Sequence, residues 1–136
     1  MKSFLARREA AIRSRDVEAL TDLYDDDVVV DTPAGGGTAK GRQAVESIYR
    51  RWFEAFPDFK LEDEQYVIDG GEVAHFARAV GTNVGGFMGL PATGKRFHIN
   101  LAFFFTVENG RITRERRIYD FTGMLIEIGV LKAKPL

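Results

Sequence analysis

The second half of the chain is dominated by long stretches in which apolar and polar residues alternate, joined by short turns that contain glycine. Period-two alternation is typical of β-strands, and connections of two or three residues join antiparallel neighbours. This half of the chain is therefore predicted to form an antiparallel sheet of long strands. Two hairpins are expected, one pairing residues 59–68 with 72–82 and the other pairing 96–107 with 111–119.

The first half shows helical spacing in three segments. Apolar residues near this spacing predict helices over residues 3–13 and 16–24, and Asp16 is placed to cap the second. A third helix is predicted over residues 41–56, where a broad aromatic stripe marks the buried face, and Pro57 ends it. Helices followed by a meander of strands predict an α+β fold, with one domain over residues 1–136.

The remaining segments are connections. A β-branched strand is predicted at residues 28–30, followed by a flexible loop at 32–37. The glycine-rich stretch at residues 85–94 matches neither a dinucleotide fingerprint nor a P-loop, so strand turns explain it better than phosphate binding. One or two helical turns are expected over residues 121–130, and residues 132–136 are expected to form a tail.

Composition excludes several classes of function. The chain has 19 Lys and Arg residues against 20 Asp and Glu, so its formal charge of -1 offers no field for nucleic acid or an acidic membrane surface. The absence of cysteine rules out disulfides, thiol catalysis and Cys-built metal sites, and no metal or cofactor is expected. No apolar stretch is long enough for a signal peptide or a membrane helix, and we expect a cytoplasmic protein.

Several short motifs lie in order along nearly the whole chain: Trp52–Phe59, Gly81–Gly85, Gly89–Lys95, Asn109–Ile112, Asp120 and Glu127–Gly129. Together they resemble the SnoaL-like polyketide cyclases, a family within the nuclear transport factor two-like superfamily. The resemblance implies a cone-shaped, curved antiparallel sheet wrapped on three N-terminal helices. It also implies a cofactor-independent enzyme in which Asp120 acts as general acid and base in closing a polyketide ring. Asn83 and Arg116 stand where the family usually has histidine and tryptophan.

The last predicted strand places the candidate catalytic groups. Strict alternation puts Arg116 and Asp120 on the face that carries Ile112, and Glu115 on the other face. If Asp120 lies in an apolar cavity, burial should raise its pKa for proton transfer, whereas a nearby Arg116 would lower it. The alternative is that Asp120 simply caps the helix that follows it. Arg116 could equally be a solvated strand residue.

The neighbouring strand offers further candidates. His98 is the preferred second proton carrier, on a row with Asn100 and Phe104, and this more polar row is expected to face the cavity. The reverse orientation, in which the apolar row faces inward, is left open. His75 lies on another central strand, and either histidine could instead be a structural residue.

Further residues complete the predicted binding site. Tyr24, at the end of the second helix, and Asp31, at the end of the first strand, are expected near the mouth of the cone. Trp52 and Phe56 belong to the aromatic helical stripe, which serves mainly as core and could also line the pocket.

Three classes of function fit these residues. The first is an enzyme that transfers protons on a small apolar carbonyl or ring compound, using Asp120 with Arg116 or His98. The second is a non-catalytic protein that binds a small apolar ligand in the same pocket. The third is a homodimeric interaction module whose sheet exposes Phe103 and Phe105 to its partner. A homodimer is expected in all three cases, because a strongly apolar sheet surface would otherwise face water.

Overall fold

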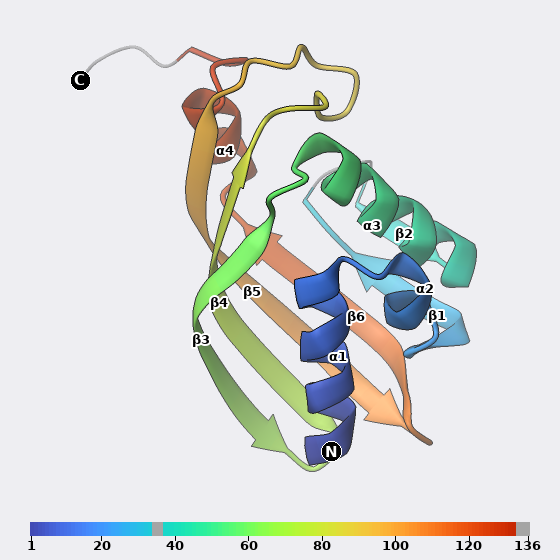
Figure 1. Cartoon of the computed structure of the whole chain (residues 1–136). Coiled ribbons are helices and arrows are strands. Elements are labelled where there is room, and N and C mark those ends of the chain that lie inside the picture. Colours follow the sequence, from blue (N-terminus) through green and yellow to red (C-terminus); the bar gives the residue numbers. More distant parts are fainter. Residues whose placement is uncertain (34–36, 133–136) are drawn as a thin grey trace.

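The computed structural model describes residues 1–33 and 37–132, and within them it contains four helices and six strands (Figure 1). The helices are α1 (Lys2–Ser14), α2 (Val17–Thr21), α3 (Arg42–Ala55) and α4 (Phe121–Glu127). The strands are β1 (Tyr24–Asp31), β2 (Thr38–Lys40), β3 (Lys60–Asp69), β4 (Glu72–Thr82), β5 (Arg96–Glu108) and β6 (Arg111–Tyr119). The predicted α+β class is confirmed.

The strands form one curved sheet in the order β2-β1-β6-β5-β4-β3. The hairpins β3–β4 and β5–β6 pair as predicted, and β4 also pairs antiparallel with β5. The exception to the antiparallel pattern is β1, which lies parallel to β6. This pairing places Tyr24, the first residue of β1, opposite Ile112 of β6.

The three N-terminal helices lie together on one face of the sheet (Figure 1). Helix α3 begins after Gly41 and ends at Phe56, just before Pro57, and its buried residues follow helical spacing. The buried row of β5 meets this layer and forms the core with the aromatic stripe. That row consists of Phe97, Ile99, Leu101, Phe103 and Phe105. The apolar row of β5 therefore faces the helices.

An extra residue on β6 changes the alternation of that strand. Thr106 of β5 pairs with Arg114 of β6, but the next β5 residue, Val107, pairs with Ile112. Thr113 is therefore the inserted residue of a β-bulge. Beyond the bulge the inward row is shifted by one position relative to Ile112, so the prediction that Ile112 shares a face with Arg116 is wrong.

Other differences from the predictions lie in the first half. Helix α2 ends at Thr21, so Tyr24 opens β1 instead of ending a helix. Strand β2 was not predicted, and it pairs with the end of β1. Of the loop predicted over residues 32–37, positions 34–36 lie outside the described residues, as do residues 133–136 of the predicted tail.

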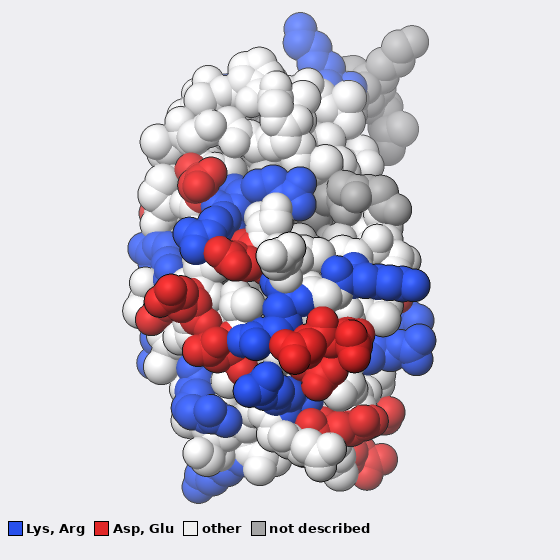
Figure 2. Space-filling model, turned by 90° about the vertical axis from the view of Figure 1, so that its right-hand side faces the viewer, with Lys and Arg blue, Asp and Glu red and all other residues white. Residues whose placement is uncertain are grey.

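Acidic and basic side chains are interleaved across the face shown in Figure 2, with no extended patch of one sign. Ion pairs account for part of this pattern. Arg42 of α3 contacts Asp22 at 2.8 Å and Asp26 at 3.2 Å, which ties α3 to the segment between α2 and β1. None of the helices in the described part of the chain is both long and apolar enough to cross a membrane.

Candidate functional site

The inward row of β6 carries charge into the core. Past the Thr113 bulge, Glu115, Arg117 and Tyr119 point toward the helices and are all buried. Glu115 is completely shielded from solvent, and its Oε2 accepts a hydrogen bond of 2.8 Å from Nε of Arg117. Since a buried charge is costly unless it is paired and hydrogen-bonded, the two side chains neutralise each other.

Two tyrosines extend this ion pair into a hydrogen-bonded chain. The hydroxyl of Tyr24 donates to Glu115 Oε1 at 2.6 Å, and the hydroxyl oxygens of Tyr24 and Tyr49 are 2.8 Å apart. Because Tyr24 gives its only proton to the carboxylate, Tyr49 must donate to Tyr24. The chain therefore runs from Tyr49 on α3, through Tyr24 on β1, to Glu115 on β6.

Electrostatics fix the protonation states along this chain. Burial and the Glu115 carboxylate raise the pKa of Tyr24 well above its ordinary value, and burial raises the pKa of Tyr49. Burial opposes the charge of Arg117, but Glu115 and the tyrosines outweigh it and hold the Arg117 pKa well above its ordinary range. Both tyrosines are therefore protonated donors at neutral pH, and Arg117 is a cation.

A small cavity of about 20 Å³ lies where α3 faces β5 and β6. It is roughly the size of one water molecule. Tyr49 and Arg117 both line it, so the hydrogen-bonded chain begins at its wall. Trp52 lines it, whereas Phe56, whose ring centroid lies 5.3 Å from that of Trp52, does not. The other lining residues are Ile12, Phe53, Phe59, Leu61, Leu101, Phe103 and Tyr119.

A second opening lies beside the cavity, between α1 and the edge strand β3. It has a volume of about 280 Å³, and charged side chains of both signs from α1 and β3 line it. It shares Ile12 and Leu61 with the small cavity, so these two side chains lie between the two spaces.

Another buried polar cluster ties α1 to the sheet. Nη1 of Arg8 lies 2.9 Å from His75 Nδ1, and His75 Nε2 lies 3.0 Å from Glu64 Oε1. Arginine can only donate, so Nδ1 is the acceptor and Nε2 carries the proton toward Glu64. His75 is stacked between Tyr66 and Phe103. Burial and the Arg8 charge lower the pKa of His75 to about 3, so the ring is neutral.

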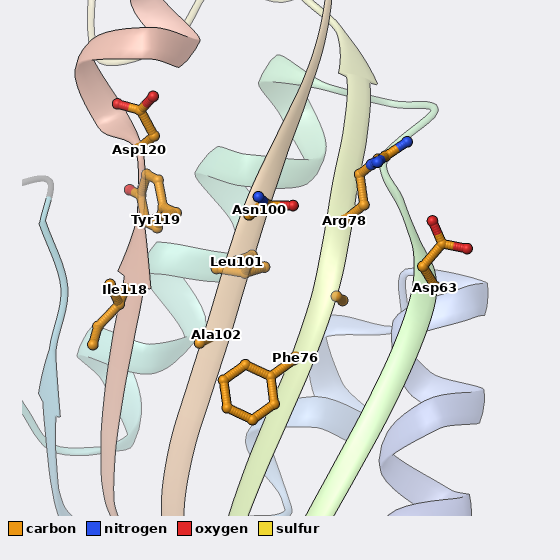
Figure 3. A pocket seen from close by; sticks show the side chains of 10 residues that line it. Asp63, Phe76, Arg78, Asn100, Leu101, Ala102, Ile118, Tyr119 and Asp120 are labelled. Atoms are coloured by element: carbon orange, nitrogen blue, oxygen red, sulfur yellow. The ribbon is translucent and has the colours of Figure 1, made fainter.

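The row of β6 that carries Arg116 faces away from the helices. Asp120 follows this row but is exposed, and its carboxylate accepts a hydrogen bond of 2.8 Å from the backbone of Gly123, which caps α4. The expectation that Asp120 lies in a closed apolar cavity is therefore wrong. It lies instead at one side of an open groove of about 520 Å³ on the outer sheet face. Figure 3 shows Asn100 between Asp120 on one side and Arg78 and Asp63 on the other.

The outer row of β5 lies on the same face. His98, Asn100 and Phe104 are exposed, so the expectation that this row faces the cavity is wrong. His98 Nδ1 lies 3.4 Å from Glu127 of α4, and its side chain is 70% exposed. Phe104 pairs across the strands with Ala74 and Arg116, and the next outward-facing row of the sheet is apolar: Phe76, Ala102 and Ile118.

Two further predicted residues hold loops. Asn83 is buried, and its Nδ2 donates to the carbonyl of Pro91 and to Thr93 Oγ1, which ties the ends of the β4–β5 connection together. Asp31 accepts a hydrogen bond of 2.8 Å from the Thr38 hydroxyl, which links β1 to β2. Both contacts are structural in kind.

Sequence reasoning missed Glu115, Arg117 and Arg8 as interior groups, because charged residues are rarely buried unless paired. The pairs that bury them are 2, 67 and 91 positions apart along the chain: Arg117 with Glu115, Arg8 with His75, and Tyr24 with Glu115. A usable signal was the density of charge in β6, a central strand, where one row must face the core.

The curved six-stranded sheet with its helices is the ketosteroid isomerase-like fold. The family model "SnoaL-like polyketide cyclase" matches residues 3–128, and this chain belongs to that family. No curated protein matches it.

Solved structures agree with this assignment. IdmH of Streptomyces antibioticus, a candidate polyketide cyclase, is 29% identical with a TM-score of 0.77, over 95% of this chain and 98% of that chain. TsrD of Streptomyces laurentii is 24% identical with a TM-score of 0.81, over 96% and 95%. A candidate polyketide cyclase of Pseudomonas putida is 20% identical with a TM-score of 0.83, over 93% and 96%. The last two show the shared fold alone.

Proposed function

We propose that the chain is a cofactor-independent enzyme that moves a proton on a small apolar carbonyl or ring compound, which reaches Tyr49 in the small cavity from the adjoining opening of about 280 Å³. The observation that carries this proposal is the hydrogen-bonded chain from Tyr49, at the cavity wall, to the fully buried carboxylate of Glu115. A polyketide-type substrate fits the family, and an intramolecular aldol closure is one reaction that begins with such a proton transfer.

The direction of the hydrogen bonds defines the step. Tyr49 donates its proton to Tyr24, so its lone pairs are free to accept a proton from a carbon next to the substrate carbonyl. As that proton arrives, the Tyr49 proton passes to Tyr24 and the Tyr24 proton passes to Glu115. The substrate becomes an enolate, whose oxygen Arg117 stabilises by charge. Return of the proton at another carbon gives isomerisation, and attack of the enolate on a second carbonyl closes a ring.

The proposal differs from the residue-based prediction in the location of the base. Asp120 is exposed and occupied by its helix cap, which gives it neither burial nor a partner across a cavity. Glu115 has both. Asp120→Asn is therefore a matched control, because it also neutralises one carboxylate of the same region but lies on the outer face.

Hydrogen–deuterium exchange tests the proposal. Aryl ketones such as 1-indanone and 1-tetralone are incubated in D₂O, and loss of the α-proton signal is followed by NMR. The wild type should accelerate exchange, Glu115→Gln should lose about a hundredfold or more of that acceleration, and Asp120→Asn should stay within about twofold. Acceleration that survives Glu115→Gln would refute the role of Glu115. No acceleration for any ketone would refute proton transfer on this class and favour the alternative, a non-catalytic binding protein.

We also propose that two copies associate through the outer face of the sheet. Phe76, Phe104 and Ile118 are 46%, 45% and 59% exposed on adjacent strands, although the predicted contact residues Phe103 and Phe105 are buried in the core. Arg78 and Asp63 border the same groove, so a copy related by two-fold symmetry can pair opposite charges around an apolar centre.

A further inference from the structure

The guanidinium group of Arg117 is only partly used by the contacts of the resting protein. Its Nε binds Glu115, and its plane lies over the Tyr49 ring at 4.6 Å. Its Nη2 is buried and has no hydrogen-bond partner among residues 1–33 and 37–132. A buried N–H group without a partner is unfavourable, and Arg117 lines the cavity, so Nη2 is a donor that a ligand there can satisfy.

The charges around the cavity also favour an anion. Arg8 and Arg117 both lie against the ring of Phe103, at 4.7 Å and 5.4 Å from its centroid. Glu115 is the one fully buried carboxylate in the described part of the chain, and it balances Arg117 alone. The direct partner of Arg8 is His75, which is neutral. The buried side chains there therefore include two cations and one carboxylate, with the partly exposed Glu64 on the other nitrogen of His75.

The walls of the cavity determine what else the ligand must carry. Tyr49, Trp52, Phe53 and Phe59 surround the space beside Arg117, with ring centroids of neighbouring pairs 5.5–6.1 Å apart. We propose that this cavity receives the carboxylate of an aromatic acid on Nη2 of Arg117, while the ring of the acid lies toward the adjoining opening, where Ile12 and Leu61 now stand. The inference rests on the proposed site but not on the proton-transfer step.

The ligand has a route to this position. The cavity itself is small, but Ile12 and Leu61 separate it from the larger opening between α1 and β3. Rotation of these two side chains joins the two spaces. An acid can then place its carboxylate on Arg117 and its ring in the position that Ile12 and Leu61 now occupy. Leu61→Ala should therefore speed association.

Trp52 provides the test, because it is the one tryptophan of the chain and lines the cavity. Its fluorescence is followed while phenylacetate or the neutral phenylacetamide, which has nearly the same shape, is added. A charge-assisted hydrogen bond to Arg117 should make the acid bind about tenfold or more tightly than the amide. Equal affinities, or no fluorescence change with either compound, would overturn the proposal.

Glu115→Gln separates this proposal from the proposed enzyme activity. The variant removes the negative charge beside Arg117, so phenylacetate should bind about tenfold more tightly while phenylacetamide is unaffected. Proton exchange should fall in the same variant. Weaker or unchanged binding of the acid would contradict the role of Arg117 even if exchange is lost. Arg78→Gln, which removes an arginine of the outer groove, should leave the preference for the acid intact; its loss would show that the acid binds outside.

Discussion

Acid should destabilise this protein through the buried ring of His75. The ring is buried and accepts a hydrogen bond from Arg8 of α1, donates one to Glu64 of β3 and stacks on Tyr66 and Phe103. Protonation would place a second positive charge directly against Arg8 and abolish the acceptor at Nδ1. In the unfolded chain the same imidazole protonates freely.

The magnitude follows from the two pKa values. Burial and Arg8 lower the folded pKa to about 3, against 6.5 for an ordinary histidine. Between these values the unfolded state binds more protons, so stability is greatest above pH 6.5 and falls as the pH drops toward 3. At 1.36 kcal/mol per pKa unit, the loss between pH 7 and pH 4.5 is about 2.5 kcal/mol. A domain of this size has a total stability of about 5–15 kcal/mol, so the loss is large enough to measure.

Urea unfolding followed by circular dichroism at pH 7 and pH 4.5 measures this loss. His75→Gln is the matched variant, because its amide can accept from Arg8 and donate to Glu64 but does not titrate. The wild type should lose about 2.5 kcal/mol more than the variant over this interval, whatever their stabilities at pH 7. An equal loss in both proteins, or an NMR titration of His75 near pH 6.5, would refute the reasoning.

Three further predictions concern other parts of the fold. Asp120→Ala should lower the free energy of unfolding by about 1 kcal/mol through loss of the α4 cap, whereas Asp120→Asn should keep most of it. Gly85→Ala should cost about 1–3 kcal/mol in urea unfolding, since a Cβ there would collide with the Glu54 carbonyl and not with a movable side chain. Phe104→Glu should convert a dimer to a monomer in sedimentation analysis, while Val84→Glu, at an exposed apolar residue of the β4–β5 connection, should not. A dimer that persists in Phe104→Glu would refute the outer-face interface.

The order of the elements was predictable because it depends on local signals. The alternation of residues 96–107 and the turn after it specify a hairpin, and the aromatic spacing before Pro57 specifies α3. The position of Tyr24 was not predictable in this way. Its apolar spacing continues that of α2, but its pairing with Ile112 of β6 overrides local preference and opens a strand. Tertiary contacts of this kind are invisible in a local window.

The choice of the inward row of β6 failed for a different reason. Both rows of this strand carry charge, so hydropathy does not decide between them, and counting from the apolar Ile112 selects Arg116 and Asp120. Thr113, one inserted residue, shifts the alternation and turns Glu115 and Arg117 inward instead. The same shift places Arg116 on the outer face. A single bulge therefore determines that Glu115 of β6, and not Asp120 just after it, is buried, and with it where a proton-transfer site can exist.

Tyr24 and Arg117 explain how this interior tolerates a carboxylate at all. Glu115 uses both oxygens, one on Tyr24 and one on Arg117, so its charge is hydrogen-bonded without contact with solvent. Arg8 anchors α1 against Phe103, the ring that Arg117 also contacts. Because the anchor of α1 and the proposed site share that ring, a shift of α1 that admits a ligand past Ile12 would also alter the packing around Arg117. Entry of the proposed ligand past Ile12 and its binding at Arg117 would thereby be coupled through the ring of Phe103.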